Sequence, residues 1–264
     1  MTKTSNGISD NIKPTQSKKK DLFGLSVDDI DCDVLTSEIS NAIKTKHQLV
    51  INYVNANSIR LIKRDISFKR ALKGSDFIHS DGIGIWLSSR LFKGEELKYR
   101  FNFTDCAEIV LRDCQLAGWT VFLLGSTNEM LERTLARLKI NFPRLRIVGT
   151  LNGYDVMKSM TVVDEINKKN PDILWVGMGT PFQELWISEN RNRLDPRIIQ
   201  SVGDLITYLA GRKARGTKFI QKIGFEWFVR FLRHPIKYFN RYIIGIPIFF
   251  FLVMKEYFSK KVID

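Results

Sequence analysis

The sequence predicts an α/β fold with a Rossmann-like, mostly parallel sheet and flanking helices, followed by a basic, amphipathic C-terminal appendage. Short apolar runs alternate with amphipathic stretches from Val34 to Gly211, as strands and helices do in such a sheet. Several of the runs end in a glycine or a turn, which is typical of a strand that feeds a helix. After Gly211 the chain becomes basic and rich in aromatic residues.

Six apolar runs are predicted as strands. They are Gln48–Val54, Asp76–His79, Thr120–Leu124, Arg144–Val148, Asp172–Val176 and Ile198–Val202. Ligands of open α/β sheets bind at the carboxyl ends of the strands, where the N-termini of helices favour phosphate. The predicted sheet is therefore suited to hold a nucleotide.

We divide the chain into three parts. Residues 1–20 are rich in Ser, Thr, Asn and Lys and end in Lys18–Lys20, so we expect a disordered basic arm that cannot bury enough apolar surface to fold. Residues 21–211 form the α/β domain, and residues 212–264 form the helical appendage.

Composition excludes several classes of protein. An apolar content of 44% and a charged content of 26% are ordinary for a folded chain, and they exclude a wholly disordered or collagen-like protein. The three cysteines form no CxxC pair, and the first residues lack the apolar core of a signal peptide. We therefore expect a cytoplasmic protein.

The charge of the chain calls for an anionic partner. The formal net charge is +13. Most of the excess is C-terminal, since residues 211–264 hold twelve Lys and Arg against three Asp and Glu. Nucleic acid, phospholipid headgroups and a phosphorylated substrate all satisfy this requirement.

The appendage contains an apolar run that favours lipid. Tyr242–Met254 is thirteen residues long and is bounded by Arg241 and Lys255. A helix needs about 20 apolar residues to cross a bilayer, so we expect this run to lie in the membrane interface with its cations on anionic lipid. The alternative is a terminal helix that packs on the core.

Two motifs at predicted strand ends carry polar groups. Asp81 directly follows a strand, so its carboxylate can act as a general base at the ligand edge; the alternative is a structural Asp-Gly turn. Gly177–Glu184 places Gln183 and Glu184 at the mouth of the sheet, or serves only to cap a helix. The Asp29–Asp33 acidic cluster resembles a metal-binding Asp-x-Asp pair but precedes the predicted sheet, so we expect no metal site.

A series of short motifs runs through most of the chain. It comprises Val54–Asn57, Ser80–Gly84, Arg100 with Asp105, Leu124–Gly125, Phe142–Pro143, Asn152–Tyr154, Pro171–Leu174, Gly177–Glu184, Val202–Gly203, Ala210–Gly211, Arg215, and Glu226–Arg230 leading to Arg241–Tyr242. In this order, from about Leu22 to Tyr242, the motifs resemble the WecG/TagA/CpsF family of glycosyltransferases.

The resemblance implies an inverting glycosyltransferase of bacterial surface polysaccharide biosynthesis, peripheral on the cytoplasmic face of the membrane. Its donor would be a UDP-sugar of the N-acetylmannosamine, mannosaminuronate or glucose type, and its acceptor a polyprenyl-diphosphate-linked saccharide. Departures from the family pattern at Asn55, Phe103 and Thr207 leave the sugar open.

The resemblance also implies roles for particular residues. Asp81 would be the catalytic base, and no cofactor is implied. The substrate-binding residues would be Asn55 and Asn57 in the pocket, Arg100 and Gln183 on the donor or its diphosphate, and Arg230, Arg233 and Arg241 of the tail on the leaving diphosphate. Because no Asp-x-Asp pair lies at the sheet edge, we expect arginines in place of a divalent metal.

Two other functions compete with this one. A basic nucleic-acid-binding module would explain the charge, but the apolar run favours lipid, so we expect no nucleic-acid partner. A non-catalytic scaffold would keep the fold alone, and the presence of Asp81, Gln183 and Arg230 argues against it.

Overall fold

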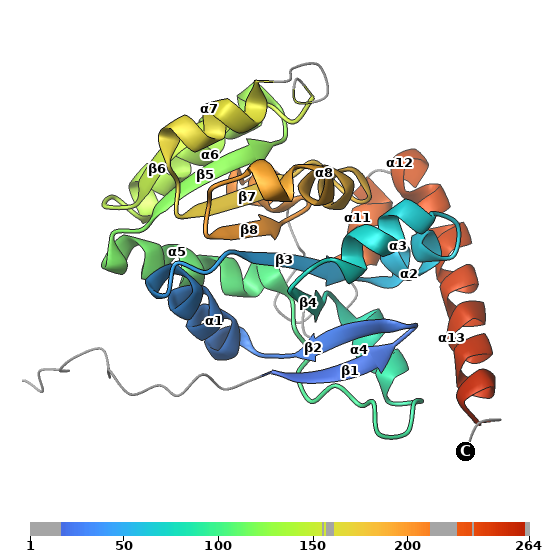
Figure 1. Cartoon of the computed structure of the whole chain (residues 1–264). Coiled ribbons are helices and arrows are strands. Elements are labelled where there is room, and N and C mark those ends of the chain that lie inside the picture. Colours follow the sequence, from blue (N-terminus) through green and yellow to red (C-terminus); the bar gives the residue numbers. More distant parts are fainter. Residues whose placement is uncertain (1–16, 155, 157–160, 212–225, 234, 262–264) are drawn as a thin grey trace, which may run out of the picture.

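The computed structural model describes residues 17–154, 156, 161–211, 226–233 and 235–261. An eight-stranded sheet forms its centre, in the order β1-β2-β4-β3-β8-β7-β5-β6 (Figure 1). The strands are β1 (Lys18–Leu22), β2 (Leu25–Asp29), β3 (Leu49–Val54), β4 (Phe77–Ser80), β5 (Thr120–Gly125), β6 (Arg146–Leu151), β7 (Ile173–Gly177) and β8 (Ile198–Ser201). Only β1 runs antiparallel to its neighbour; the remaining pairs of this described sheet are parallel. The predicted fold class is confirmed.

Helices cover both faces of the sheet. They are α1 (Cys32–Lys44), α2 (Ala56–Ile62), α3 (Ile66–Lys73), α4 (Ile83–Ser89), α5 (Phe103–Ala117), α6 (Asn128–Asn141), α7 (Val162–Lys169), α8 (Phe182–Asn190) and α9 (Leu205–Leu209). Side chains of β7 alternate between the faces: Trp175 packs with α1, α5, α6 and α9, whereas Leu174 packs with α7 and α8. Both faces are buried, which is why the strands are continuous apolar runs.

The six predicted strands are present, with ends shifted by at most three residues. The prediction of a disordered arm through Lys20 is wrong for its last three residues, because β1 begins at Lys18 and pairs with β2. Residues 1–16 lie outside the described part of the chain. A lysine run hides this strand from a search for apolar alternation, yet lysines suit an edge strand because they discourage pairing with other chains. Leu22 is buried at its end.

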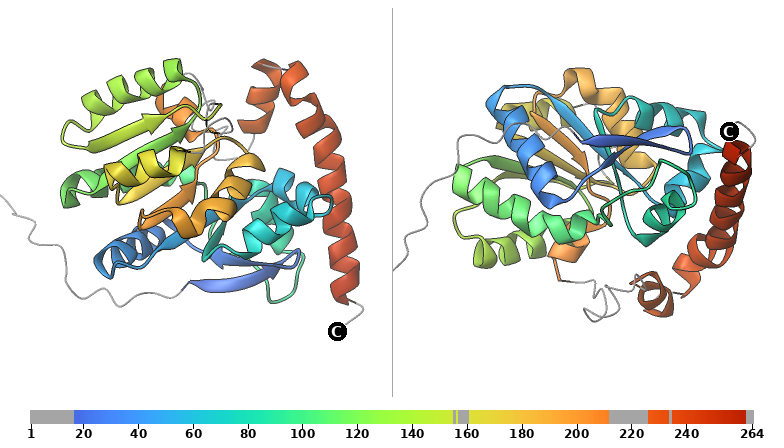
Figure 2. Two further views of the ribbon diagram at one scale, coloured as in Figure 1. Left: turned by 45° about the horizontal axis from the view of Figure 1, so that its top comes forward. Right: turned by 90° about the horizontal axis from the view of Figure 1, so that it is seen from below.

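The C-terminal appendage is helical where it is described. It contains α11 (Glu226–Arg233), α12 (Pro235–Phe239), the π-helical turn η3 (Asn240–Ile244) and α13 (Gly245–Lys261). Figure 2 shows α13 as a long helix along one side of the molecule, and it packs against α2. The buried Phe249 and Val253 of α13 join a core cluster with residues of α2, α3 and α4.

The remaining sides of this helix are apolar and open. Ile246, Phe250, Phe251 and Phe258 of α13 are exposed, as are Ile243 and Ile244 of the preceding η3. The expectation that the segment is too short to span a membrane needs correction, because the helix extends beyond the apolar run: Asn240–Ser259 is 20 residues long, enough to cross a membrane by length and composition. Its contacts with α2 nevertheless hold it against the α/β domain.

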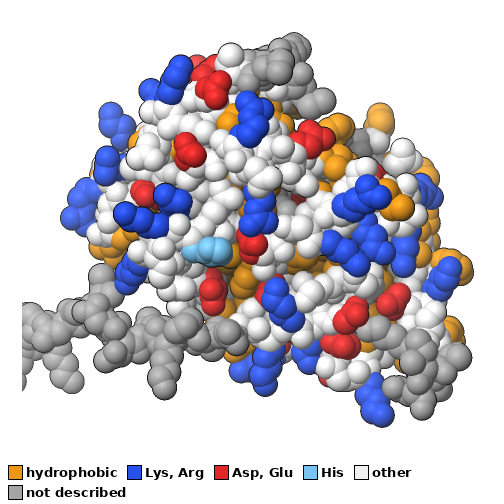
Figure 3. All heavy atoms as spheres, in the orientation of Figure 1, with side chains coloured by type: hydrophobic (Ala, Val, Ile, Leu, Met, Phe, Trp, Pro, Cys, Tyr) orange, Lys and Arg blue, Asp and Glu red, His pale blue; other side chains and the backbone are white. Residues whose placement is uncertain are grey.

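A second basic surface lies beside α13. Figure 3 shows Lys and Arg side chains gathered over α2 and α3, next to the apolar edge of the molecule. The exposed residues there are Lys63, Arg64, Arg70 and Lys73. The count along the sequence assigned most of the positive charge to the tail, whereas folding places this second group of cations next to it.

Candidate functional site

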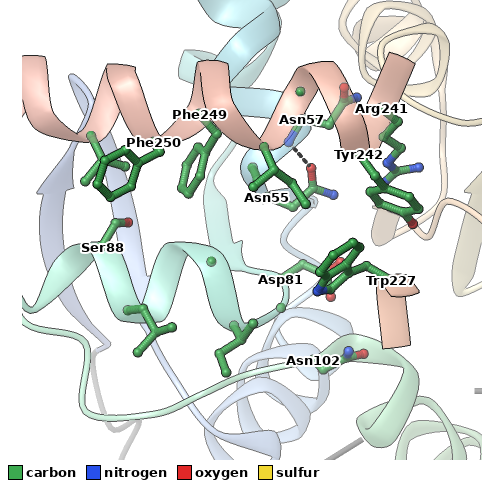
Figure 4. A pocket seen from close by; sticks show the side chains of 18 of the residues that line it. Asn55, Asn57, Asp81, Ser88, Asn102, Trp227, Arg241, Tyr242, Phe249 and Phe250 are labelled. Carbon is green, nitrogen blue, oxygen red and sulfur yellow. Dashed lines mark hydrogen bonds between the residues drawn. The ribbon is translucent and has the colours of Figure 1, made fainter. Parts of the chain in front are cut away.

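Two cavities open at the carboxyl edge of the sheet. The larger has a volume of about 540 Å³ and lies between α4 and the helices of the appendage (Figure 4). The smaller, about 270 Å³, lies over the ends of β3, β4, β7 and β8. Its lining is more polar and includes Tyr53, Thr104, Gly179, Thr180, Gly203 and Asp204. We call them the apolar cavity and the polar pocket.

The two cavities meet at a junction of five residues. Asn55, Asn57, Asp81, Asn102 and Arg241 line both of them. Asp81 is the one carboxylate that the two described linings share. It directly follows β4, and its backbone N–H donates to the Val54 carbonyl at 2.8 Å, which fixes it beside the end of β3.

Two of the three asparagines of the junction, Asn55 and Asn102, cap the starts of helices. The Asn55 side chain caps α2, with its Oδ1 accepting from the backbone N–H groups of Asn57 at 3.0 Å, drawn dashed in Figure 4, and Ser58 at 3.1 Å. Asn102 caps α5, with its Oδ1 accepting from Thr104 at 2.9 Å. Both caps tie the start of a helix to the site, so these side chains are held in place without a ligand.

Arg241 lines the junction, and a second arginine, Arg60, lies next to it without lining either cavity. Arg60 donates to Oδ1 of Asn57 at 2.9 Å, and its buried Nε has no hydrogen-bond partner among the described residues. Burial, together with the positive charges of Arg64 and Arg241, lowers the pKa of Arg60. An anion nearby would offset this repulsion between cations. Sequence reasoning missed Arg60, although its position three residues after Asn57 puts the two on one side of α2.

The tail forms one wall of the apolar cavity. Trp227 of α11 and Tyr242 of η3 both line it, and their ring centroids are 5.7 Å apart. Figure 4 shows Trp227, Asp81 and Arg241 at one end of this cavity. Segments far apart in sequence therefore meet around Asp81.

Beneath the polar pocket, Gln183 ties two strand ends together. Its Oε1 accepts from the backbone N–H groups of Gly179 at 3.2 Å and Gly203 at 3.0 Å. Its Nε2 donates to the Tyr53 hydroxyl at 3.1 Å and to Oε1 of Glu184 at 2.9 Å. The contact of Gln183 with the donor stays a prediction; this side chain is fully buried, its amide is satisfied, and it lines neither cavity.

Gly203 owes its identity to this packing. Its φ of +54° is left-handed, and a Cβ there would lie 2.6 Å from the Tyr53 hydroxyl. Any larger residue would push Tyr53 away from Gln183 and Thr180. The glycine after β8 is thus required by the floor of the polar pocket.

Glu184 is buried in the same network. Its Oε1 accepts from the Thr180 hydroxyl at 2.8 Å, whereas Oε2 has no hydrogen-bond partner among the described residues. Burial raises the pKa of Glu184 to about 6, against the lowering effect of its hydrogen bonds with Gln183 and Thr180. The expectation that Gln183 and Glu184 stand at the mouth of the sheet is therefore wrong, since both lie below it.

The other predicted site residues are divided between the site and its surroundings. Arg100 lines the apolar cavity. Arg233 is exposed and lines neither cavity, and Arg230 belongs to α11 with a side chain outside the described part. Sequence reasoning missed Asn102, whose signal was its place as a helix-capping residue directly before α5.

The acidic cluster near the N-terminus has structural roles. Asp29 accepts from the backbone N–H groups of Lys98 at 2.9 Å and Tyr99 at 3.1 Å, and Asp31 caps α1. Among the described residues no group of three or more His, Cys, Asp or Glu side chains could hold a metal ion. Metal independence stays a prediction.

Comparison with known proteins gives one consistent match. The model of the glycosyl transferase WecG/TagA/CpsF family matches residues 20–262. The N-acetylglucosaminyldiphosphoundecaprenol N-acetyl-beta-D-mannosaminyltransferases of Staphylococcus aureus strains MW2 and NCTC 8325 are each 27% identical over 243 residues, covering 91% of this chain and 94% of the relative. The match spans the α/β domain and the appendage together.

The buried carboxyl gives a prediction for stability. The folded state holds the Glu184 proton more tightly than the unfolded chain, so this group costs stability as pH rises from 4.5 to about 6, and the whole cost is present above that window. The free energy of unfolding of Glu184→Gln, relative to that of the wild type, should rise by about 2 kcal/mol from about pH 4 to about pH 7.5. Urea unfolding at both pH values measures this gain. Glu132→Gln, at an exposed site on α6, is the matched control. If the difference in unfolding free energy between Glu184→Gln and the wild type is the same at both pH values, the prediction is wrong.

Proposed function

The chain belongs to the WecG/TagA/CpsF family of glycosyltransferases, and from this premise we propose that it moves a sugar from a UDP-sugar to a polyprenyl-diphosphate-linked saccharide. The names of its relatives describe transfer of N-acetylmannosamine to N-acetylglucosaminyl-diphosphoundecaprenol, and a sugar of this type is the one we propose for this chain. The observation that carries the proposal is Asp81, which lines both the polar pocket and the apolar cavity.

The polar pocket fits a nucleotide-sugar donor. It lies at the carboxyl ends of four parallel strands, where open α/β sheets bind nucleotides. The N-terminal residues Phe103 and Thr104 of α5, a 15-residue helix, form part of its lining. The partial positive charge at such a helix end suits the diphosphate of the donor.

Asp81 would then act as the general base. An acceptor hydroxyl at the junction gives its proton to the Asp81 carboxylate while its oxygen bonds to the anomeric carbon of the donor sugar. The bond from that carbon to the diphosphate oxygen breaks, and UDP leaves with the electron pair. Because one displacement occurs, the anomeric configuration is inverted. Position between the two cavities is what this role requires.

Arginines would stabilise the charge that develops on the leaving diphosphate. Arg241 lines both cavities, and Arg60 stands close enough for the charge of Arg241 to lower its pKa. Positioned guanidinium groups bind phosphate oxygens through paired hydrogen bonds, and they gain most where charge develops in the transition state. Arg241 would supply this charge at the junction in place of a metal ion, and Arg60 would add to it from behind Asn57.

The enzyme would reach its acceptor as a peripheral protein of the cytoplasmic membrane face. The exposed apolar side of α13 lies next to the cations of α2 and α3, which is the pairing of surfaces that an anionic bilayer attracts. The contacts of α13 with α2 favour a helix lying on the membrane over one that crosses it. Lipid-linked substrates stay in the bilayer, so this surface brings the junction to them.

The first prediction from the proposed function concerns proton transfer. Asp81→Asn preserves shape and removes the proton acceptor, so kcat should fall about 10²–10⁴-fold while UDP still binds. Release of UDP in the presence of a lipid-linked acceptor measures kcat, and calorimetry measures UDP affinity. Asp105→Asn is the control, because this exposed carboxylate of α5 lines neither cavity. Asp81→Asn activity within threefold of the wild type would exclude Asp81 as the base.

The second prediction separates two arginines of the tail. Arg241→Ala removes a charged donor from the junction and should lower kcat/KM about 10–100-fold. Arg233→Ala, at an exposed position outside both cavities, should retain activity close to that of the wild type. If the two variants are equally impaired, the tail acts through its total charge and not through Arg241.

The third prediction concerns metal ions. Because Arg241 lines the junction and would bind the diphosphate, UDP release should continue at its full rate in excess EDTA. Loss of activity in EDTA that magnesium or manganese restores would show that a metal replaces or assists the arginines. Thermal unfolding in the same buffers distinguishes this result from loss of the fold.

A further inference from the structure

The part of the apolar cavity farthest from Asp81 is a groove between two helices. One wall is α4 with the turn that follows it, contributing Leu87, Ser88 and Leu91; the other is α13, contributing Ile246, Phe249, Phe250 and Val253. Leu87, Leu91 and Phe250 are 50%, 45% and 64% exposed, so large apolar side chains are left facing open space. Single apolar residues on a surface are common, whereas a continuous apolar lining that leads to the junction at Asp81 indicates a binding site.

Few charged side chains line this cavity. The charged side chains in its described lining are Asp81, Arg100 and Arg241. Figure 4 shows Asp81 and Arg241 at the end near Trp227, while Phe249, Phe250 and Ser88 lie farther along α13 and α4. A ligand that fills the cavity must therefore be anionic at one end and hydrocarbon at the other.

The floor of the groove is closely packed. A Cβ on Gly84 would lie 3.5 Å from the ring of Phe249, so the absence of a side chain there lets this ring rest against α4. Phe249 is buried and belongs to the core, whereas the next residue, Phe250, faces the groove. Residues Gly245 to Val253 of α13 give the groove a length of about 12 Å, room for about two isoprene units.

We propose that this groove binds the first isoprene units of the acceptor, next to its diphosphate, so that α13 is a wall of the acceptor site as well as a membrane anchor. The inference rests on the proposed function. Its occupant is the polyprenyl chain and not a bilayer phospholipid, because the groove continues directly into the junction, where Asp81 would receive the proton of the attached sugar.

Two neighbouring phenylalanines provide the test. Phe250 lines the groove, and Phe251, which is 67% exposed on the same helix, does not. Phe250→Ser and Phe251→Ser remove equal apolar area from the membrane-facing helix, but only the first changes the groove. Acceptors carrying one, two, three and many isoprene units on the same diphosphate-sugar are compared in detergent, where membrane docking contributes nothing.

For the wild type and Phe251→Ser, KM for the acceptor should fall steeply up to about two isoprene units and then level off. For Phe250→Ser, KM for the two-unit acceptor should rise about tenfold, since an apolar contact worth about one power of ten in affinity is lost. Leu87→Trp fills the groove, so KM for the acceptor should level off at a shorter isoprene chain. Leu116→Trp, at an exposed site on α5 outside both cavities, is its control.

Three results would overturn the inference. Equal KM values for Phe250→Ser and Phe251→Ser across the series would show that α13 serves as an anchor alone. A wild-type KM that does not change with the number of isoprene units would show that the groove does not bind the lipid chain. If the wild type binds UDP but turns over none of the acceptors, the proposed function is wrong, and this inference fails with it. This result differs from the other two, in which turnover is observed.

Discussion

Parallel pairing of β3, β4, β7 and β8 forces their carboxyl ends onto one edge of the sheet. The register aligns Val54 with Ser80 and Val176 with Ser201, so the residues that follow these strands emerge side by side. Asp81 follows β4 directly, and Gly203 comes shortly after β8. Gln183 then bonds the backbone beyond β7 to that beyond β8, which holds the floor of the polar pocket in one arrangement. Every later feature of the site depends on this edge.

The appendage completes what the sheet begins. The sheet edge supplies Asp81 and a polar pocket, but the wall opposite α4 comes from Trp227, Tyr242 and α13. This explains why α13 is apolar on more than one side: Phe249 meets the α/β domain, Phe250 meets the groove, and Phe251 remains exposed. Under our proposal, the same helix packs on the α/β domain, lines the acceptor groove and faces the membrane. Its composition therefore does not follow the pattern of a surface helix with one apolar and one polar side.

The sequence allowed the fold to be predicted where one physical signal dominated. Buried parallel strands are continuous apolar runs, so β3, β4, β5, β7 and β8 were found to within about two residues. β1 was missed because its three lysines suit an exposed edge and lack an apolar period. The packing of α13 on α2 could not be predicted from the local sequence pattern either. It depends on which of the several apolar faces of α13 contacts the α/β domain.

The site could be predicted in part. Asp81 and Asn55 follow strands directly, so their place at the edge comes from the chain itself. Gln183 lies on α8, and whether such a side chain faces a ligand or the protein depends on Tyr53, Gly179 and Gly203, which are distant in sequence. Arg60 was missed for a similar reason, because its importance arises from the proximity of Arg241 in the folded tail.

The central claim is that donor and acceptor occupy separate cavities that meet at Asp81, and amide hydrogen exchange tests it most directly. UDP alone should slow exchange at residues 179–180 and 203–205, which line the polar pocket. A short-chain, diphosphate-linked acceptor alone should slow exchange in α4 and in residues 245–253 of α13. With both ligands the two patterns should add. Protection of the same amides by each ligand, or protection of α13 by UDP alone, would contradict the account.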